Sequence, residues 1–483
     1  MGVLEGLQPE KVFKYFEQIC SIPHGSGNVE AISNYLCDFA KRRGLTFIQD
    51  EYYNVIIKKP ASDNAHSKTP VILQGHMDMV AVKTQDKVKD MDKDGLDLII
   101  ENGYIGADGT SLGADDGIAV AYALAILDSD EYVHPPIEAI FTVDEEVGMT
   151  GAQGINTDCI DGRMMLNIDS EEEGIFLAGC AGGATLKIQF PVHMCKSEGI
   201  ETDIRIHGLT SGHSGTDIIY QRANANNIAG RILLGARNKG IRVISINGGE
   251  KDNSIAPYAD IRLIIDKDMY EETADCINKT AQALKREYLV TDPEMQIEIN
   301  KGRETVCDAY DNDTTQTIIN ALEFIPDGVI RMSNDIEGLV ETSLNLGVIS
   351  SDDTACTATY LIRSSVESQK EYIIQKVTDI AQLIGGKCSI SGVYPAWEFQ
   401  RESTLRDIMC DSYKELYGSN PKVETMHAGV ECGIMAAKIK GLDCVSFGPD
   451  IKDIHTVKER LDIQSTMRTW KLIIDILKKL ADR

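Results

Sequence analysis

The sequence predicts an α/β domain, with a mostly parallel sheet and helices on both faces, that is interrupted by an inserted α+β domain. Three observations predict this architecture. Short apolar runs alternate with helical segments over residues 1–186, longer strand-like runs pair with helices over residues 187–396, and the first pattern returns over residues 397–483. Strands that alternate with helices are typical of a parallel sheet covered on both faces. We therefore expect the first and last segments to form one domain around the insertion.

The first segment begins with two expected helices, which are followed by expected strands. Residues 9–20 and 29–43 carry apolar side chains at helical spacing, and the second helix ends at Gly44. The strand-like runs lie at residues 54–58, 71–74, 137–143 and 164–168. A helix of small apolar residues, 118–127, lies between the second and third of these strands.

The insertion is expected to hold two α+β units of similar plan, although no sequence repeat is visible. The first has strands at 202–207, 241–246 and 259–265 and helices at 216–236 and 270–288. The second has helices at 312–324 and 367–384 and strands at 342–349, 355–363 and 387–394. A polar stretch around residues 308–314 is expected to join them. After the insertion, helices are expected at 403–417, 427–439 and 464–481, with a strand at 443–447.

The composition of the 483-residue chain excludes several classes of function. It has 48 Lys and Arg against 75 Asp and Glu, so its formal net charge is −27. Proteins that bind nucleic acid or an anionic membrane need a basic face, so we expect neither partner. With 43% hydrophobic and 25% charged residues, the chain can build ordinary cores and is not a disordered protein.

The same sequence predicts a cytoplasmic protein. The N-terminal residues have neither the basic region nor the apolar core of a secretory signal, and Gly6 stands where a myristoylation pattern needs Ser or Thr. The longest strongly apolar run, 118–127, is about half of a membrane span. The 12 cysteines include no C-x-x-C pair, so we expect reduced thiols and no zinc held by paired cysteines.

Residue types that bind metals follow several of the expected strands. His76 and Asp78 follow the strand at 71–74, and residues two apart on an extended chain point the same way. Asp78 can therefore reach the His76 ring and fix the tautomer of a metal-bound imidazole. A strand-end histidine with a chance neighbour is the ordinary alternative. Asp115 and Asp116 precede the helix at 118–127, where an aspartate most often serves as a helix cap.

Three further segments repeat this pattern. The acids Asp144, Glu145 and Glu146 follow the strand at 137–143, and adjacent buried carboxylates repel one another unless cations lie between them. A solvated loop is the alternative interpretation of such a triplet. Asp169 ends the strand at 164–168, and His455 follows the strand at 443–447.

Taken together, the five segments predict a metal centre. In an open α/β sheet, ligands bind beyond the carboxyl ends of the strands; four of the segments end a strand there, and the fifth starts the helix between two of them. A histidine, an aspartate able to bridge, a glutamate, a second aspartate and a distant histidine suit two borderline cations such as zinc. The competing motifs H-E-x-x-H and G-x-x-x-x-G-K-[ST] do not occur in the sequence.

The sequence resembles the di-zinc aminopeptidase/carboxypeptidase clan and, within it, the aminoacyl-histidine dipeptidases, also called cytosolic non-specific or Xaa-His dipeptidases. The motifs that carry the resemblance are GHMDMV (75–80), SLGADDGIAVAYALAIL (111–127), TVDEEVGMTGA (142–152), LNIDSEEEG (166–174), GLTSGHSGTDI (208–218), HAGVECG (427–433) and SFGPDIKDIHT (446–456). They occur in the family's order over nearly the whole chain. HAGVECG and the long insertion point to the dipeptidase branch.

The resemblance implies a role for each metal-binding residue and makes the α/β domain catalytic. His76 and His455 would each bind one metal, Asp115 would bridge both, and Glu146 and Asp169 would complete the two ligand sets. The metals would be two zinc ions per subunit, with cobalt or manganese as possible substitutes.

Other matched positions imply roles in the reaction. Glu145 matches the general base, Asp78 the acid that orients a histidine, and His213 the residue that reaches the oxyanion from the inserted lid domain. Arg363 matches a clamp on the substrate carboxylate and Asn253 a further polar contact. Taken alone, Arg363 could equally form a surface ion pair, and His213, between glycines, could lie on a mobile turn. The remaining histidines are expected to be structural or exposed: His24, His66, His134, His193, His207 and His427.

The implied activity is hydrolysis of dipeptides with broad specificity, Xaa-His and β-alanyl-histidine included, by a metal-bridging water with Glu145 as base. Ser211 and Val457 depart from the family pattern, where glycine and proline are common, but neither is a metal ligand. A homodimer is expected. Two alternatives stay open: a deacylase or carboxypeptidase of the same clan, and a non-catalytic protein that binds zinc or peptides.

Overall fold

The computed structural model describes residues 2–483, which form two compact units. The first unit takes the chain up to Gly179 together with Phe399–Thr425 and Val430–Arg483. The second unit takes Cys180–Glu398 together with Met426–Gly429. The chain therefore enters the second unit twice, first for a long segment and later for four residues.

Eight strands form the main sheet of the first unit. Their order is β1 (Thr46–Gln49), β2 (Val55–Lys59), β6 (Ile137–Thr142), β3 (Val71–His76), β7 (Met164–Asn167), β19 (Asp443–Ser446), β8 (Ile175–Cys180) and β18 (Lys422–Met426). The central pairs β6–β3, β3–β7 and β7–β19 are parallel, whereas β1–β2, β2–β6 and β19–β8 are antiparallel. The sheet is thus parallel at its centre, as predicted, and antiparallel toward its edges.

Burial accounts for the clearest strand predictions of this sheet, although β8, buried at five of its six residues, was not predicted. Every residue of β3 and β6 is buried, so both strands are covered on both faces and appear as unbroken apolar runs. The edge strands β1 and β18 are half-buried or exposed, and they lack such a signal. The helices of the unit are α1 (Glu10–Cys20), α2 (Glu30–Arg43), α3 (Ala114–Leu127), α4 (Thr150–Gly154), α9 (Thr404–Tyr417), α10 (Glu431–Lys438) and α11 (Ile463–Ala481).

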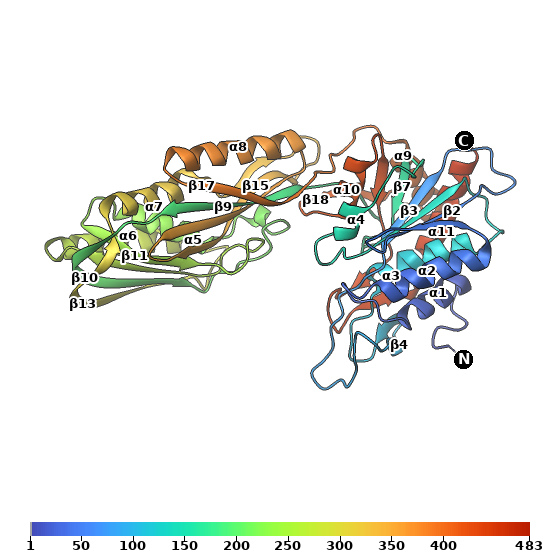
Figure 1. Ribbon diagram of the computed structural model, residues 1–483, viewed down its shortest axis with the longest axis horizontal. Helices are drawn as coiled ribbons and strands as arrows, with labels where there is room; N and C mark the ends of the chain where they lie inside the picture. The colour runs from blue at the N-terminus through green and yellow to red at the C-terminus, as the bar shows by residue number, and fades with distance from the viewer. Residues whose placement is uncertain (1) are drawn as a thin grey trace. The chain divides into compact units, whose positions relative to one another are not determined.

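Helix α3 is the most deeply buried helix of the first unit. All 14 of its residues are buried, and it packs between α1 and β3 (Figure 1). Its regular part begins after Asp115 and Asp116, which have non-helical backbone angles. Gly113 precedes it with φ = 66°, and a Cβ there would lie 2.7 Å from Met79 Sδ, so only glycine fits this turn.

A small four-stranded sheet in the same unit was not predicted. Its order is β20 (Ile451–Lys452), β21 (Arg460–Asp462), β5 (Tyr104–Ala107) and β4 (Leu98–Glu101). These strands are two to four residues long and largely exposed at β4, so they carry no clear apolar alternation. The sheet fixes the loop between β20 and β21, which contains His455.

The second unit is built on one nine-stranded antiparallel sheet. Its order is β13 (Gln296–Tyr310), β10 (Met194–His207), β12 (Ala259–Ile265), β11 (Ile241–Gly248), β15 (Val340–Ser351), β16 (Ala355–Ser364), β9 (Gly182–Pro191) and β17 (Lys387–Tyr394), and β14 (Gly328–Met332) pairs with β15. Four helices cover it: α5 (Ala225–Gly235), α6 (Tyr270–Glu287), α7 (Asn312–Phe324) and α8 (Glu367–Leu383) (Figure 1). Buried and exposed residues alternate along β10 and β12, as in a sheet with one covered face.

The second unit contains two halves of the same βαββαβ plan. One half comprises β10, α5, β11, β12, α6 and β13; the other comprises β9, α7, β15, β16, α8 and β17. In each half the fourth strand lies beside the first, followed by the third and the second. The second strands of the two halves, β11 and β15, meet at the pair Gly248↔Ile349 and join both into one sheet.

The expected linker between these halves is a correction. The polar stretch at 308–314 is not a connecting segment: Asp308 and Tyr310 lie in β13, and Asp311 caps α7 by accepting a hydrogen bond from the Thr314 N–H. Long strand β13 was missed because most of its residues are exposed. No helix within residues 2–483 is both long and apolar enough to cross a bilayer. No disulfide joins any of the 12 cysteines within residues 2–483.

Candidate metal centre

The carboxylate of Asp115 lies between two imidazoles of the first unit. Its Oδ1 is 3.1 Å from His76 Nε2, and its Oδ2 is 3.1 Å from His455 Nε2. His76 is the last residue of β3, Asp115 lies in the first turn of α3, and His455 comes from the loop between β20 and β21. Three segments distant in sequence thus place one carboxylate so that it faces two histidines.

Each imidazole has a further carboxylate of its own. Asp169 Oδ1 lies 3.4 Å from His76 Nε2, and Glu146 Oε1 lies 2.9 Å from His455 Nε2. The arrangement is therefore paired: His76 with Asp169 lies on one side of Asp115, and His455 with Glu146 lies on the other. This is the arrangement that two metal ions bridged by one carboxylate require.

The donor atoms fit divalent cations. Glu146 Oε1 lies 2.9 Å from His455 Nε2, and the same nitrogen is 3.1 Å from Asp115 Oδ2. An imidazole nitrogen that faces two carboxylate oxygens suits three ligands gathered around one ion. Nitrogen and oxygen donors gather within 4.8 Å of one another in three groups: Asp115, Glu146 and His455; His76, Asp116 and Asp169; and His76, Glu145 and Glu146. Mixed imidazole and carboxylate donors are typical of zinc and similar metals.

The electrostatics of these residues also favour cations. Burial, reinforced by the nearby carboxylates of Asp169, Glu431 and Glu146, raises the pKa of Glu145 well above its usual range. Hydrogen bonds to the carboxylates of Asp115 and Glu146 raise the pKa of His455 to about 10. A buried group of acids that holds protons this firmly lacks compensating positive charge, which bound cations would supply.

Asp78 lies behind His76 and is completely buried. The nearest partner of His76 Nδ1 is the backbone carbonyl of Asp78 at 2.9 Å, and the Asp78 carboxylate is 3.5 Å away. The carboxylate instead accepts hydrogen bonds from Ser26 Oγ at 2.8 Å and from the Glu145 N–H at 3.1 Å. Asp78 therefore contacts the backbone of one predicted site residue and the ring of another.

Three buried acids near the centre had no predicted role. Asp116 Oδ2 has no hydrogen-bond partner within the described chain. Glu431 Oε2 accepts hydrogen bonds from Gln74 Nε2 at 2.7 Å and Thr142 Oγ1 at 2.6 Å, and burial raises the pKa of Glu431 to about 7. Glu459 accepts hydrogen bonds from the turn before α3. Asp116 and Glu431 lie inside motifs already noted, whereas Glu459 carries no local signal.

A second group of polar residues, which we call the cationic cluster, lies in the second unit. It comprises His213, Ser343, Arg363, Tyr394 and His427. Arg363 is only 6% exposed; its Nη1 donates to Tyr394 Oη at 2.8 Å, and its Nη2 lies 3.4 Å from His213 Nε2. Within residues 2–483 this guanidinium forms no ion pair, and its Nε has no hydrogen-bond partner. His213 and Arg363 therefore lie side by side, and no carboxylate within residues 2–483 neutralises the charge of the guanidinium.

His427, expected to be structural or exposed, belongs to this cluster. It is buried, its Nε2 lies 2.7 Å from Ser343 Oγ, and its Nδ1 has no hydrogen-bond partner in the described chain. Burial, together with Arg363 and His213, lowers the pKa of His427 to about 3. Asn253 is exposed, and its backbone carbonyl accepts the Ser214 N–H at 2.9 Å. Because Ser214 follows His213 in the chain, Asn253 lies close to His213.

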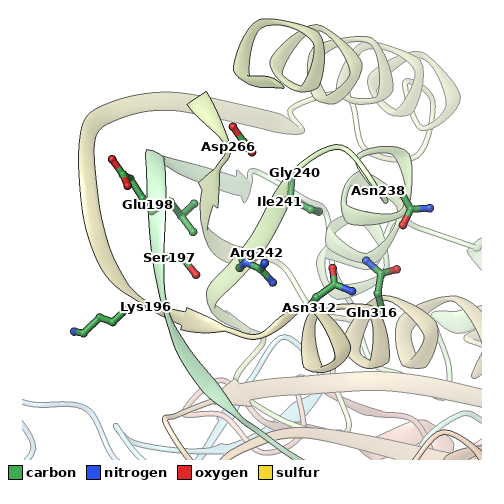
Figure 2. Close-up of a pocket in the computed structure, with 11 residues that line it drawn as sticks. Lys196, Ser197, Glu198, Asn238, Gly240, Ile241, Arg242, Asp266, Asn312 and Gln316 are labelled. Carbon is green, nitrogen blue, oxygen red and sulfur yellow. The ribbon is translucent and has the colours of Figure 1, made fainter. Parts of the chain in front are cut away.

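One pocket of the second unit lies apart from the cationic cluster. It has a volume of about 470 Å³ and is lined by the ends of β10, β11 and α7. Figure 2 shows its acids Glu198 and Asp266 on one side and the amides of Asn312 and Gln316 on the other, with Arg242 between them. No predicted site residue lines this pocket.

Comparison with known proteins agrees with the geometry of the first unit. The sequence profile of peptidase family M20/M25/M40 matches residues 72–479. The chain belongs to this family. As an M20/M25/M40 member it is a metal-dependent peptide hydrolase.

One curated relative and two solved structures are similar to this chain. A cytosol non-specific dipeptidase of Escherichia coli (strain K12) is 34% identical over 492 residues, covering 99% of each chain. The crystal structure of an aminoacylhistidine dipeptidase from Vibrio alginolyticus superposes with a TM-score of 0.93 and 36% identity, covering 99% of this chain and 98% of that one. An aminopeptidase from Bacillus cereus, at 16% identity and a TM-score of 0.56, shares the fold.

Proposed function

We propose that this M20/M25/M40 peptidase is a dipeptidase that uses two divalent metal ions, with Xaa-His dipeptides and β-alanyl-histidine among its substrates. The observation that carries the proposal is the Asp115 carboxylate, 3.1 Å from each of two imidazoles. The two relatives of more than 30% identity, named as dipeptidases, support the substrate class.

Five residues would hold the metals. His76 and Asp169 would bind one, His455 and Glu146 would bind the other, and Asp115 would bridge them. When bound, two cations such as zinc would lower the pKa of a water from 15.7 to about 7 and polarise the scissile carbonyl. Cobalt or manganese would serve similarly, because both accept nitrogen and oxygen donors.

Glu145 would act as the general base. It is adjacent to Glu146 in the chain, and its carboxylate lies in one group with donor atoms of His76 and Glu146. It would take a proton from the attacking water and deliver it to the leaving amine, which is general base and then general acid catalysis by one carboxylate. Asp78 would hold Glu145 in place through the 3.1 Å hydrogen bond from the Glu145 N–H.

The cationic cluster would bind the negative parts of the substrate. A guanidinium offers a planar pair of donors that matches a free carboxylate, and Arg363 has no carboxylate partner within residues 2–483. His213, 3.4 Å from Arg363, would stabilise the oxyanion that forms during attack, with Asn253 as a further polar contact. An enzyme that binds the terminal carboxylate measures substrate length, and this favours dipeptides over longer peptides.

The alternatives within the clan make different predictions for a small substrate panel. Purified protein should hydrolyse β-alanyl-histidine and several α-dipeptides faster than a tripeptide or an N-acyl amino acid. Metal analysis should find two divalent ions, preferably zinc, and chelation should abolish hydrolysis until metal is restored. A faster rate on the N-acyl amino acid would favour a deacylase, and metal binding without hydrolysis would favour a binding protein. We also propose a cytoplasmic homodimer, which gel filtration and cell fractionation can test.

A further inference from the structure

Glu459 accepts hydrogen bonds from a whole turn of backbone. Its Oε2 accepts from the N–H groups of Leu112 at 2.8 Å and Gly113 at 3.1 Å. Its Oε1 accepts from Ala114 at 2.8 Å and from Asp115 at 3.4 Å. Glu459 is buried, at 4% exposure, so it is held where water cannot replace these bonds.

This turn has no cap of its own. Helix α3 begins after Gly113, which has no side chain, and no local side chain caps its first N–H groups. The first four N–H groups of a helix need partners from outside the helix. Glu459 supplies a partner for two of them, Ala114 and Asp115, and for the two N–H groups before them, from more than 340 positions away in the sequence. The Asp115 carboxylate is consequently free to face the two imidazoles.

Glu459 also lies on the same loop as His455. The two are four residues apart between β20 and β21. His455 has φ = 61°, a conformation that residues other than glycine rarely adopt, and its side chain is 44% exposed. A half-exposed side chain on such a backbone is not fixed by packing alone. The strands β20 and β21 fix the two ends of this loop, and its buried residue Glu459 links it to the turn that contains Asp115.

We propose that Glu459 is a positioning residue that holds His455 and Asp115 at the spacing needed to bind a shared pair of metals. It is not among the residues proposed to hold the metals or the substrate. It acts through the backbone. His455 lies on the same loop as Glu459, and the Glu459 carboxylate accepts hydrogen bonds from the turn that contains Asp115. The inference rests on the proposed metal centre, because it assigns Asp115 and His455 as ligands.

The test compares metal binding in Glu459→Gln with that in a matched variant, Glu138→Gln. Glu138 is also buried in the first unit and accepts backbone N–H groups, from Asp161 at 3.0 Å and Gly162 at 2.8 Å, but it lies at the start of β6, the end opposite the metal centre. In Glu459→Gln an amide NH2 faces N–H donors. Outer partners of metal ligands typically change affinity about 10- to 100-fold, so the Kd of the weaker zinc should rise by about that factor. Glu138→Gln should leave both zinc constants within about twofold of wild type.

Two further measurements separate positioning from a general loss of stability. Cobalt(II) bound in place of zinc should show a changed visible absorption spectrum in Glu459→Gln and an unchanged one in Glu138→Gln. Glu459→Asp keeps the charge but shortens the reach, and it should give intermediate zinc affinity even if Glu459→Gln folds poorly. Equal zinc constants in wild type and in both Glu459 variants would overturn the inference. So would equal losses in Glu459→Gln and Glu138→Gln. Wild-type protein that binds no pair of metals would instead contradict the proposed function.

Discussion

The two units each hold a polar cluster with unpaired buried atoms, but of opposite charge. Around the first cluster, Asp116 Oδ2 and Glu431 Oε1 are carboxylate oxygens without a hydrogen-bond partner within residues 2–483. In the cationic cluster, the corresponding atoms of the described chain are nitrogens, Arg363 Nε and His427 Nδ1. Buried polar groups are nearly always hydrogen-bonded in folded proteins, so these atoms are candidates for contact with a ligand.

The two clusters differ in the charge that they would attract. Burial, together with neighbouring acids, raises the pKa of Glu145, as expected where cations are favoured. Burial, together with Arg363 and His213, lowers the pKa of His427, as expected where anions are favoured. Under the proposed function, the first cluster would hold the metal ions and the cationic cluster the substrate carboxylate.

The largest expected effect comes from neutralising the residue shared by both sides of the first cluster. Asp115→Asn removes the negative charge of the carboxylate that faces two imidazoles, each 3.1 Å away. We expect the bound metal to fall from two ions to at most one and dipeptide hydrolysis to fall to the level of metal-stripped protein. Metal analysis and initial rates check this. Asp108→Asn, the same change at a 67% exposed side chain, is the control, and retention of two metals in Asp115→Asn would break the comparison.

The next effect separates two neighbouring acids of that cluster. Glu145→Gln should lower kcat by about 10²- to 10⁴-fold while keeping two metals, because general base catalysis contributes about that factor. Glu146→Gln should instead weaken metal binding, because its oxygen lies 2.9 Å from His455 Nε2. Calorimetric zinc titration and steady-state rates distinguish the two. Unchanged hydrolysis in metal-loaded Glu145→Gln would remove this residue from the reaction.

The sequence predicted the fully buried strands β3 and β6, but it missed β8, which is almost as buried, and exposed strands such as β1 and β13. The fold class is confirmed, because β3, β6 and β7 are apolar runs whose burial fixes their type. The four-stranded sheet and the edge strand β13 carry weak apolar patterns, and only pairing with distant segments makes them strands. The joining of two βαββαβ halves through Gly248↔Ile349 also depends on a contact between residues about a hundred positions apart.

The candidate site shows the same limit. The carboxyl ends of parallel strands meet at one edge of a sheet, which is why the sequence could indicate that His76, Asp169 and Glu146 lie near one another. Their roles stay predictions. Glu459 and His427 were missed because their partners, the turn before α3 and Ser343, lie 84 or more positions away and no local pattern marks them.

A smaller effect should come from the cationic cluster and should depend on the substrate. Hydrogen bonds to charged groups contribute about 1.5–3 kcal/mol, so Arg363→Met should lower kcat/KM for dipeptides by about 10- to 100-fold. The same variant should barely change kcat/KM for a dipeptide amide, which has no terminal carboxylate. Arg262→Met, at a 52% exposed position of the same sheet, is the control. Equal losses on acid and amide would show that Arg363 does not bind the carboxylate.

The smallest effect is a pH dependence of stability that comes from His427. Its pKa is lowered to about 3 in the folded protein, against about 6.5 in an unfolded chain. Below pH 6.5 the unfolded chain therefore binds a proton that the folded protein rejects, so stability is complete above pH 6.5 and is lost as the pH falls toward 3. Between pH 7 and pH 5 this costs about 2 kcal/mol of unfolding free energy.

Urea denaturation of wild type and His427→Gln at pH 5, 6 and 7 measures that loss. The difference between the two proteins should shrink as the pH falls, because the variant has no imidazole to protonate. His193→Gln, at an exposed histidine of the same unit, should follow wild type at every pH. Arg363→Met should also flatten the dependence, since Arg363 is one cause of the lowered pKa. A dependence that persists unchanged in His427→Gln would mean that the positive charge of the second cluster is not felt at this imidazole, and the contrast between the two units would then rest on Arg363 alone.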